Sequence, residues 1–435
     1  MTALRSRCLL LAYSLAWWLA LPLVLARLWW RGRQEPGYRR HLFERLGFPP
    51  VSRTGVPCLW LHAVSVGETR AAQPLIETLL QTYPQHDLLL THMTPTGRET
   101  GKTLFAQHGA RVRQAYLPYD AGALVARFLR VTQPQLCILM ETEIWPGVMA
   151  ACAARQVPVV LLNARLSERS LRRAHRLGRL MRDAAHRLTA VGAQSQADAD
   201  RIISLGVNPV TVTGSIKFDV SPPPSASAAG ATLRAQIRAR HVWLCASTRD
   251  GEEALLLDAL ARQPLTADTL LLIVPRHPQR FDQVAALVTE RGLTLQRRSQ
   301  LGSDTVTAQV LLGDSMGEMF AYCAASDLVW MGGSLLRLGG QNPIEPFALG
   351  KPVLLGLHTF NFAEVCDEAI AAGAAQRVVD ADALVTAVIA LLGDPSRRIQ
   401  MGERAAAFAA RHRGATARSM ALLAPLVQAV PPVAS

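Results

Sequence analysis

Residues 59–80, LWLHAVSVGETRAAQPLIETLL, join a run of apolar residues, a short turn of small residues and a segment with helical periodicity. This order predicts a β-strand, a tight turn and an α-helix. Gly67 and Glu68 fall at the start of the predicted helix. Because strand, turn and helix follow one another repeatedly along the chain, this stretch sets the expected fold of the whole protein.

Similar apolar runs recur, each followed by a stretch of helical composition. Repeated strand and helix predict parallel sheets with helices on both faces, so we expect an α/β fold with two Rossmann-like domains. In two such domains the ligand site is expected in the cleft that they face. The runs are CLWLHAV (58–64), DLLLTHM (87–93), VRQAYL (112–117), LCILM (136–140), VPVVLL (157–162) and LTAV (188–191), then VWLCA (242–246), TLLLIV (269–274), AQVLL (308–312), LVWM (328–331) and PVLL (352–355).

These patterns divide the chain into five parts. We expect an N-terminal membrane anchor at 1–33 and a Rossmann-like domain at 34–218. Residues 219–232 have three consecutive prolines and many small residues, the composition of a linker. A second Rossmann-like domain is expected at 233–395, and an Ala- and Arg-rich helix and tail at 396–435.

The N-terminal segment predicts an association with a membrane. Residues 8–30 are apolar except for Ser14 and Arg27, and as a helix they are long enough for a bilayer core of about 30 Å. More arginines follow the segment than precede it, which predicts that the body stays on the cytoplasmic side. A cleaved signal peptide is disfavoured because no small-residue cleavage site follows. The segment either spans the membrane or lies in its interface, since Pro22 can kink it.

Charge and cysteine content narrow the classes of partner. Lys and Arg outnumber Asp and Glu by 46 to 33, and the net charge of +13 favours anionic partners such as phosphates, nucleotides or anionic lipids. The seven cysteines are scattered without a C-x-x-C pair, so neither a zinc knuckle nor a dithiol redox motif is expected. They are typical of reduced, mostly buried thiols in a reducing compartment.

Glu68 has two interpretations. A glutamate in the first turn of a helix offsets the helix dipole, an effect of ~0.3 to 1 kcal/mol. It is also a carboxylate that can take a proton from a hydroxyl group. THMTPTG (91–97) and METEIWPG (140–147) follow later strands, and parallel strands end at one edge, so polar groups are expected to converge there. Glu141 and Glu143 are either two catalytic carboxylates or a structural pair held by arginines.

Residues 163–188 carry eight arginines and predict one basic amphipathic helix. Its charged side is either a solvated surface or a site for anions such as the phosphates of a lipid acceptor.

The second predicted domain contains turns suited to a nucleotide. CASTRDGEE (245–253), IVPRHPQRF (273–281) and LLGDSMGEM (311–319) each place backbone N–H groups at a helix start, where they can bind phosphate or ribose. MGGSLLRLGGQNPIEPFALGKPVLLG (331–356) has glycines that let a ligand approach the backbone, and Glu345 can bind a ribose diol. The alternative is a structural turn rich in glycine and proline.

In this order the motifs resemble those of the membrane-anchored 3-deoxy-D-manno-octulosonate (Kdo) transferases of lipopolysaccharide synthesis. The matching motifs are H-A-V-S-V-G-E, T-P-T-G, E-T-E-I-W-P, N-A-R-x-S-x-R-S, P-R-H-P-x-R-F, G-D-x-M-G-E and G-G-S-L…G-G-x-N-x-x-E-P, which run from about His62 to Phe362. Three positions depart from the family pattern. Gln341 stands where the family usually has His, Ser215 where it has Asn, and Gly147 where Asn is common.

The resemblance implies a GT-B glycosyltransferase that moves Kdo from CMP-Kdo to the glucosamine disaccharide precursor of lipid A, with inversion, on the cytoplasmic face of the bacterial inner membrane. Glu68 matches the general base of the family. No cofactor, metal or nucleic acid is expected, because helix N-termini and Arg276 can stabilise the single departing phosphate. The implied acceptor-side residues are Ser65, Gly67, Thr94, Thr96, Glu141, Glu143 and Arg165, and the implied CMP-binding residues are Ser247, Arg276, His277, Gly313, Met316, Gly317, Gly333, Ser334, Asn342 and Glu345.

Two alternatives remain, one an enzyme and one without enzymatic activity. One is a membrane-associated GT-B transferase that uses a different nucleotide sugar. The other is a basic membrane protein that binds nucleotides or anionic lipids without turnover.

Overall fold

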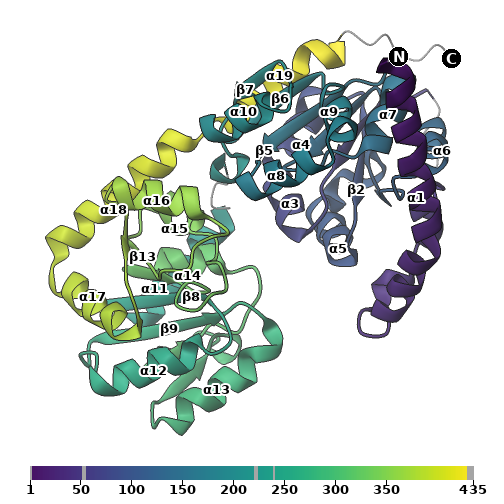
Figure 1. Ribbon diagram of the computed structural model, residues 1–435. Helices are drawn as coiled ribbons and strands as arrows, with labels where there is room; N and C mark the ends of the chain where they lie inside the picture. The colour runs from purple at the N-terminus through teal and green to yellow at the C-terminus, as the bar shows by residue number, and fades with distance from the viewer. Residues whose placement is uncertain (1, 51–54, 220–223, 239–240, 429–435) are drawn as a thin grey trace. The chain divides into compact units, whose positions relative to one another are not determined.

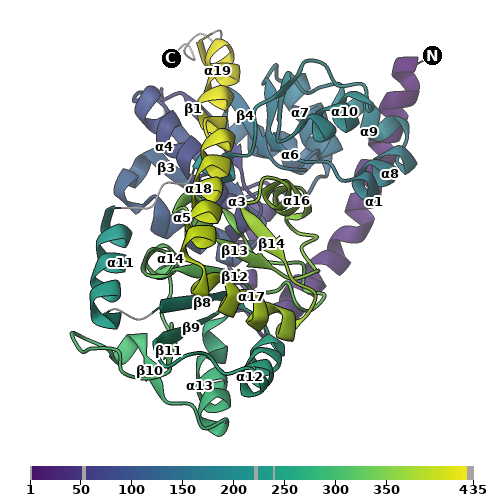
Figure 2. The same ribbon diagram turned by 90° about the vertical axis from the view of Figure 1, so that its left-hand side faces the viewer.

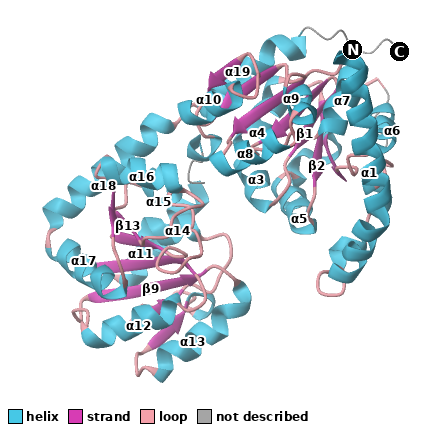
Figure 3. Ribbon diagram, viewed as in Figure 1, coloured by secondary structure: helices cyan, strands magenta, loops and turns pink. Residues whose placement is uncertain are grey.

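A computed structural model of the chain describes residues 2–50, 55–219, 224–238 and 241–428. The chain forms two compact units, Met1–Asp219 with Arg413–Ser435, and Val220–His412. Each unit contains a parallel β-sheet packed between helices (Figures 1 and 3). The two sheets confirm the α/β fold that the alternating pattern predicts.

The sheet of the first unit has seven strands in the order β3-β2-β1-β4-β5-β6-β7, and every neighbouring pair is parallel. Residues of β1 are buried on both faces, as is typical of a sheet covered by helices on each side. The strands are β1 (Cys58–His62), β2 (Asp87–His92), β3 (Val112–Tyr116), β4 (Leu136–Met140), β5 (Val159–Ala164), β6 (Ala190–Ala193) and β7 (Val210–Val212).

Two hydrophobic cores lie on opposite faces of this sheet, because successive side chains of a strand point to opposite sides. Trp60 packs with Phe128 on one face, with ring centroids 5.1 Å apart. Leu61 packs with Leu75 on the other. The helices of the unit are α1 (Thr2–Arg31), α2 (Leu42–Arg45), α3 (Val66–Ala71), α4 (Gln73–Thr82), α5 (Pro95–Leu104), α6 (Gly122–Thr132), α7 (Pro146–Ala154), α8 (Glu168–Arg176), α9 (Arg179–Ala185), α10 (Gln196–Ile203) and α19 (Ala415–Gln428).

The last helix returns to the first unit. In Figure 2 the yellow α19 lies beside α4, and Leu423 and Val427 belong to the same core as Leu75. The carboxylate of Asp219 accepts hydrogen bonds from the backbone N–H groups of Gly414 (2.6 Å) and Thr416. These bonds join the two points at which the chain leaves and re-enters the first unit.

The second unit has a parallel sheet of seven strands in the order β10-β11-β9-β8-β12-β13-β14. Its strands are β8 (His241–Thr248), β9 (Thr269–Pro275), β10 (Leu295–Arg297), β11 (Val310–Leu312), β12 (Leu328–Met331), β13 (Val353–Leu355) and β14 (Ala375–Arg377). Its helices are α11 (Pro224–Ile237), α12 (Glu252–Arg262), α13 (Phe281–Glu290), α14 (Met319–Ala325), α15 (Ile344–Ala348), α16 (Ala363–Ala371), α17 (Ala381–Gly393) and α18 (Pro395–His412).

Sequence periodicity missed three strands, β7, β10 and β14. Each has three residues and lies at an edge of its sheet. An edge strand has a neighbour on one side only, and these three are partly exposed, so they lack the apolar runs of the central strands.

Two local expectations were wrong. The predicted linker 219–232 becomes helical at Pro224, and α11 packs against α14, while residues 220–223 lie outside the described part of the chain. The predicted single basic helix is divided into α8 and α9, because Gly178 adopts a φ of 54°, a left-handed conformation that glycine tolerates. The tail is helical as expected, in α18 and α19.

The apolar N-terminal segment forms one continuous helix with Pro22 inside it. Within the described residues, Arg5–Arg31 is the one helix long and apolar enough to cross a membrane, with a mean hydropathy of 2.1. All seven cysteines are free, and only Cys8 is exposed, which confirms that they are mostly buried.

A substitution at Gly356, which follows β13, tests how tightly this part of the second unit is packed. A Cβ at this position would lie 2.2 Å from the carbonyl oxygen of Ser334. We therefore expect Gly356→Ala to lower the free energy of unfolding by about 1–3 kcal/mol, because the adjoining loop must move. Thermal unfolding in detergent measures this change. Gly393→Ala is the control, since its added Cβ meets no atom within 4 Å; equal midpoints for the two variants would contradict the expectation.

Candidate active site

The residues expected on the acceptor side gather at one edge of the first sheet. β2, β1, β4 and β5 are consecutive parallel neighbours, so their carboxyl ends lie side by side. Thr94 and Thr96 follow β2, and Ser65, Gly67 and Glu68 follow β1, whereas Glu141 and Glu143 follow β4 and Arg165 follows β5. The backbone N–H of Arg165 donates to the carbonyl oxygen of Glu141 at 3.3 Å.

The Glu68 side chain folds back over the turn before α3. Its Oε2 accepts a hydrogen bond from the backbone N–H of Val64 at 2.8 Å, and the Ser65 hydroxyl donates to Oε1 at 3.4 Å. Burial and, to a smaller extent, the charges of Glu141 and Glu143 together raise the pKa of Glu68 to about 7, although the hydrogen bond from the Val64 N–H opposes the increase. Glu68 thus fits both interpretations. It lies at a helix start, where a carboxylate offsets the helix dipole, and it has the near-neutral pKa that suits a general base.

Glu141 and Glu143 have different partners. Lys217 Nζ lies 2.8 Å from Glu141 Oε1, and the Trp145 indole N–H donates to Glu143 Oε2 at 2.6 Å. Burial raises the pKa of Glu143 despite the hydrogen bond from Trp145, and the Glu141 charge adds to the increase. The backbone of Glu141 has a φ of 60°, which is uncommon outside glycine and turns the chain sharply at the strand end.

Sequence reasoning missed Lys217. It lies in the short 3-10 helix η3 (Ile216–Asp219), far from Glu141 in the sequence. The side chain of Asn163, at the end of β5, accepts a hydrogen bond from the backbone N–H of Ile216 at 3.1 Å. This contact brings η3 to the carboxylates. The signal in the sequence is TGSIKFD (213–219), which places Lys217 two residues after Ser215.

Thr94 supports the turn that carries Glu68. Its Oγ1 caps α5 by accepting from the Gly97 N–H at 3.1 Å, and it donates to the carbonyl oxygen of Val64 at 3.3 Å. A Cβ at Gly97 would lie 3.2 Å from the carbonyl carbon of Ser65, so glycine permits this close approach of α5. Thr96 and Gly67 are exposed at the same edge.

The residues expected on the nucleotide side gather at one edge of the second sheet. β11, β9, β8 and β12 are consecutive parallel neighbours. Gly313, Met316 and Gly317 follow β11, Arg276 and His277 follow β9, Ser247 lies near the end of β8, and Gly333 and Ser334 follow β12. Asn342 and Glu345 lie at the start of α15, where the Asn342 side chain accepts from the backbone N–H of Ile344 at 3.1 Å.

A buried glutamate that was not predicted, Glu252, holds this edge together. Its carboxylate accepts from the backbone N–H groups of Gly333 (2.6 Å), Leu335 (3.0 Å) and Arg249 (3.0 Å). Burial raises the pKa of Glu252, whereas these three hydrogen bonds oppose the increase. Glu252 therefore fixes the loop after β12 to the start of α12.

Positive charges surround His277. Burial lowers its pKa, and the neighbouring guanidinium groups of Arg249, Arg276 and Arg280 lower it further. Arg280 also forms a two-point ion pair with buried Glu253, with N–O distances of 2.7 and 2.9 Å. Arg249 and Arg276 make this strand end a favourable place for an anion such as a phosphate.

The side chain of Ser334 has a structural role in the loop. It is fully buried, and its Oγ accepts from the Gly356 N–H at 2.9 Å and donates to the carbonyl oxygen of Met331 at 2.5 Å. Gly333 has a φ of 70°, and a Cβ added there would lie 3.2 Å from Gln341 Nε2. Gln341, which departs from the family pattern, thus lies against the glycine loop. Met316 is exposed at the same edge.

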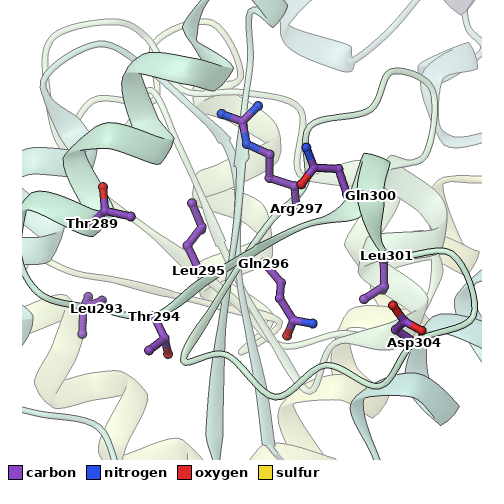
Figure 4. A pocket seen from close by; sticks show the side chains of 9 residues that line it. All are labelled: Thr289, Leu293, Thr294, Leu295, Gln296, Arg297, Gln300, Leu301 and Asp304. Carbon is purple, nitrogen blue, oxygen red and sulfur yellow. The ribbon is translucent and has the colours of Figure 1, made fainter.

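Among the described residues, no group of three or more His, Cys, Asp or Glu side chains is placed to hold a metal ion. A hollow of about 540 Å³ lies beside edge strand β10, and Figure 4 shows the side chains of Arg297, Gln300 and Asp304 around it. None of the predicted site residues lines this hollow.

Comparisons with known proteins give consistent results. A family profile described as 3-deoxy-D-manno-octulosonic-acid transferase (kdotransferase) matches residues 40–220. The 3-deoxy-D-manno-octulosonic acid transferase of Bordetella pertussis is 43% identical over 428 residues, which cover 94% of this chain and 97% of that protein. The enzyme of the same name from Haemophilus influenzae is 37% identical over 419 residues, covering 94% and 96%.

A solved structure supports the fold. The UDP-GlcNAc 2-epimerase of Neisseria meningitidis bound to UDP-GlcNAc matches 86% of this chain and 100% of its own, with a TM-score of 0.57 and 15% identity. The two-sheet, GT-B-like architecture expected from the sequence is confirmed by this likeness, which concerns the fold alone.

Glu252 offers a test of the nucleotide-side edge. Glu252→Gln places an amide NH2 against backbone donors, so we expect the free energy of unfolding to fall by about 1–3 kcal/mol. Chemical unfolding followed by tryptophan fluorescence measures the change. Glu290→Gln, at an exposed position, is the matched control and should stay within about 0.5 kcal/mol of the original protein. Equal stability of the two variants would show that the three hydrogen bonds do not hold the loop.

Proposed function

Because the chain belongs to the family of 3-deoxy-D-manno-octulosonic acid (Kdo) transferases, which are glycosyltransferases, we propose that it transfers Kdo from CMP-Kdo to the glucosamine disaccharide precursor of lipid A. Glu68 is the general base of this reaction, and the anomeric carbon is inverted. The observation that supports this role is the carboxylate of Glu68 at a strand end, with a pKa of about 7 beside Glu141 and Glu143.

The proposed reaction is a single displacement at the anomeric carbon. The acceptor hydroxyl gives its proton to the Glu68 carboxylate while its oxygen forms a bond to the anomeric carbon of Kdo. The bond from that carbon to the phosphate oxygen of CMP breaks, and CMP leaves with the electron pair. A base with a pKa near the working pH is ionised often enough to accept the proton and basic enough to hold it.

The second unit supplies the groups for CMP in this proposal. Arg276 and Arg249 favour the negative charge that builds on the departing phosphate. Backbone N–H groups of the loop after β12 are held in place by Glu252. The remaining predicted nucleotide-side residues lie along the same edge, where CMP contacts to Asn342 and Glu345 are expected.

The N-terminal helix is the proposed attachment to the inner membrane, with the catalytic body on the cytoplasmic side. Its apolar residues and the arginines that follow it support this location. A lipid-linked acceptor is confined to the membrane surface, so an attached enzyme meets it without leaving that surface.

Glu68→Gln tests the proposed base. The amide cannot accept a proton, so transfer should fall by about 10²- to 10⁴-fold while CMP-Kdo still binds. Mass spectrometry of the lipid A precursor, incubated with detergent-purified protein and freshly generated CMP-Kdo, counts the Kdo units added. Glu99→Gln is the control, because Glu99 is exposed and has only a long ion pair with Lys102. Undiminished transfer by Glu68→Gln would exclude Glu68 as the base. Inhibition of transfer by UDP but not by CMP would exclude CMP-Kdo as the donor.

The pH dependence provides an independent test. Since Glu68 acts when ionised and its pKa is about 7, kcat/KM should fall about tenfold per pH unit below that pH. Glu143→Gln removes a neighbouring negative charge, lowers the pKa of Glu68 and should move the acid limb to lower pH. Glu99→Gln should leave the limb in place. An acid limb that stays fixed in Glu143→Gln would assign it to another group.

A further inference from the structure

The N-terminal helix α1 has two faces of different chemistry. Figure 1 shows α1 running along the side of the first unit beside α6 and α7. Ser14, Trp17, Leu21, Val24 and Leu28 recur every three or four residues and face the body of the unit. The hydroxyl groups of the apolar segment are on this inward face, so the opposite face is apolar from Leu9 to Leu23, and Arg27 follows one turn later.

Polar contacts dock the first half of α1. The Tyr13 hydroxyl donates to Asp120 Oδ2 at 2.9 Å, and the backbone N–H of Gly122 donates to Ser14 Oγ at 3.1 Å. Asp120 is 2% exposed and also accepts from the N–H groups of Gly147 (2.8 Å) and Val148 (2.7 Å) at the start of α7. Burial raises the pKa of Asp120 to about 6. Tyr13 thus completes the hydrogen bonding of a buried carboxyl group.

Apolar contacts dock the second half. The Trp17 ring stacks on Tyr119 with centroids 5.7 Å apart. Leu21 and Leu28 are buried in one cluster with Tyr119 and Leu124. Near the N-terminus, Arg179 Nε of α9 donates to Ser6 Oγ at 3.3 Å. The contacts extend from residue 6 to residue 28, which is about 33 Å of helix at 1.5 Å per residue.

The outward face of α1 is apolar and exposed. Leu11, Leu15, Leu19 and Leu23 are 60–75% exposed. Trp29 and Trp30 at the end of the helix are also exposed, as are Phe43 and Phe48 in the segment that follows α1. Exposed arginines border this surface at positions 27, 31, 33 and 40, and α1 contains no acidic residue. An apolar surface bordered by cations matches the acyl chains and anionic headgroups of a lipid leaflet.

We propose that α1 stays docked on the first unit in the membrane-bound protein and lies in the plane of one leaflet instead of crossing the bilayer. A docked helix that crossed would carry α6 and α7 into the hydrocarbon, together with the exposed charges of Arg127, Arg130 and Arg155. A helix that detached to cross would leave Asp120 without the Tyr13 donor and place two hydroxyl groups in lipid. The inference concerns attachment and does not depend on the reaction.

A disulfide across the docked interface tests this placement. A Cβ on Gly122 would lie 3.7 Å from Ser14 Oγ, so the pair Ser14→Cys and Gly122→Cys places two sulfur atoms within reach of each other. The full chain carries Cys8→Ala, because Cys8 is the exposed native thiol and the other six are buried. After mild oxidation of native membranes, alkylation and intact mass count the thiols that remain. Ala12→Cys with Gly122→Cys is the control, since Ala12 lies on the exposed face.

In the membrane, most of the protein with the Ser14/Gly122 pair should form the disulfide, whereas the control pair should stay reduced. The oxidised protein should remain in the membrane pellet after a high-salt wash and keep the unfolding midpoint of the reduced protein. Oxidation no greater than in the control would overturn the proposal, as would release of the oxidised protein from the membrane. Leu19→Gln with Leu23→Gln provides a second test on an undisturbed interface. These changes should release folded protein into solution, and unchanged membrane binding would also overturn the proposal.

Discussion

Every strand in both sheets runs parallel to its neighbours, and a parallel sheet collects the carboxyl ends of all its strands at one edge. Side chains far apart in the sequence thereby become neighbours without any special long-range contact. Glu68, Glu141 and Arg165 each follow a different strand of the first sheet. Arg276 and Gly333 do the same in the second. The proposed chemistry of each unit depends on this arrangement.

The two edges have opposite electrostatic character. In the first unit, the ends of the neighbouring strands β1 and β4 bring three glutamates close together, and Lys217 balances part of their charge. In the second, three arginines surround His277, while the acidic Glu252 and Glu253 are buried beneath the loops and serve to hold them. An edge rich in carboxylates suits the removal of a proton, and an edge rich in guanidinium groups suits a phosphate. The proposed division between an acceptor side and a donor side rests on this difference.

The N-terminal helix combines the composition of a membrane segment with the contacts of a docked surface helix. Mean hydropathy averages over the whole helix. It cannot distinguish a membrane-spanning helix from a docked surface helix, because both are long and apolar. The distinction lies in a few polar groups. Tyr13 and Ser14 are isolated hydroxyls in the sequence, but in the structure they bind a buried carboxyl group and a backbone N–H.

The sequence alone determined the two-sheet α/β fold, the apolar N-terminal helix and the edges at which the predicted site residues gather, because apolar runs and their periodicity are local properties. The ordered motifs also indicated the family. The sequence patterns did not reveal the three short edge strands, and they did not show that Gly178 divides the basic helix. Only the tertiary structure brought Lys217 to Glu141, placed Glu252 under the glycine loop and seated α1 against Asp120. These contacts join residues from separate elements, and the burial that raises the pKa of Glu68 exists only once those elements have packed.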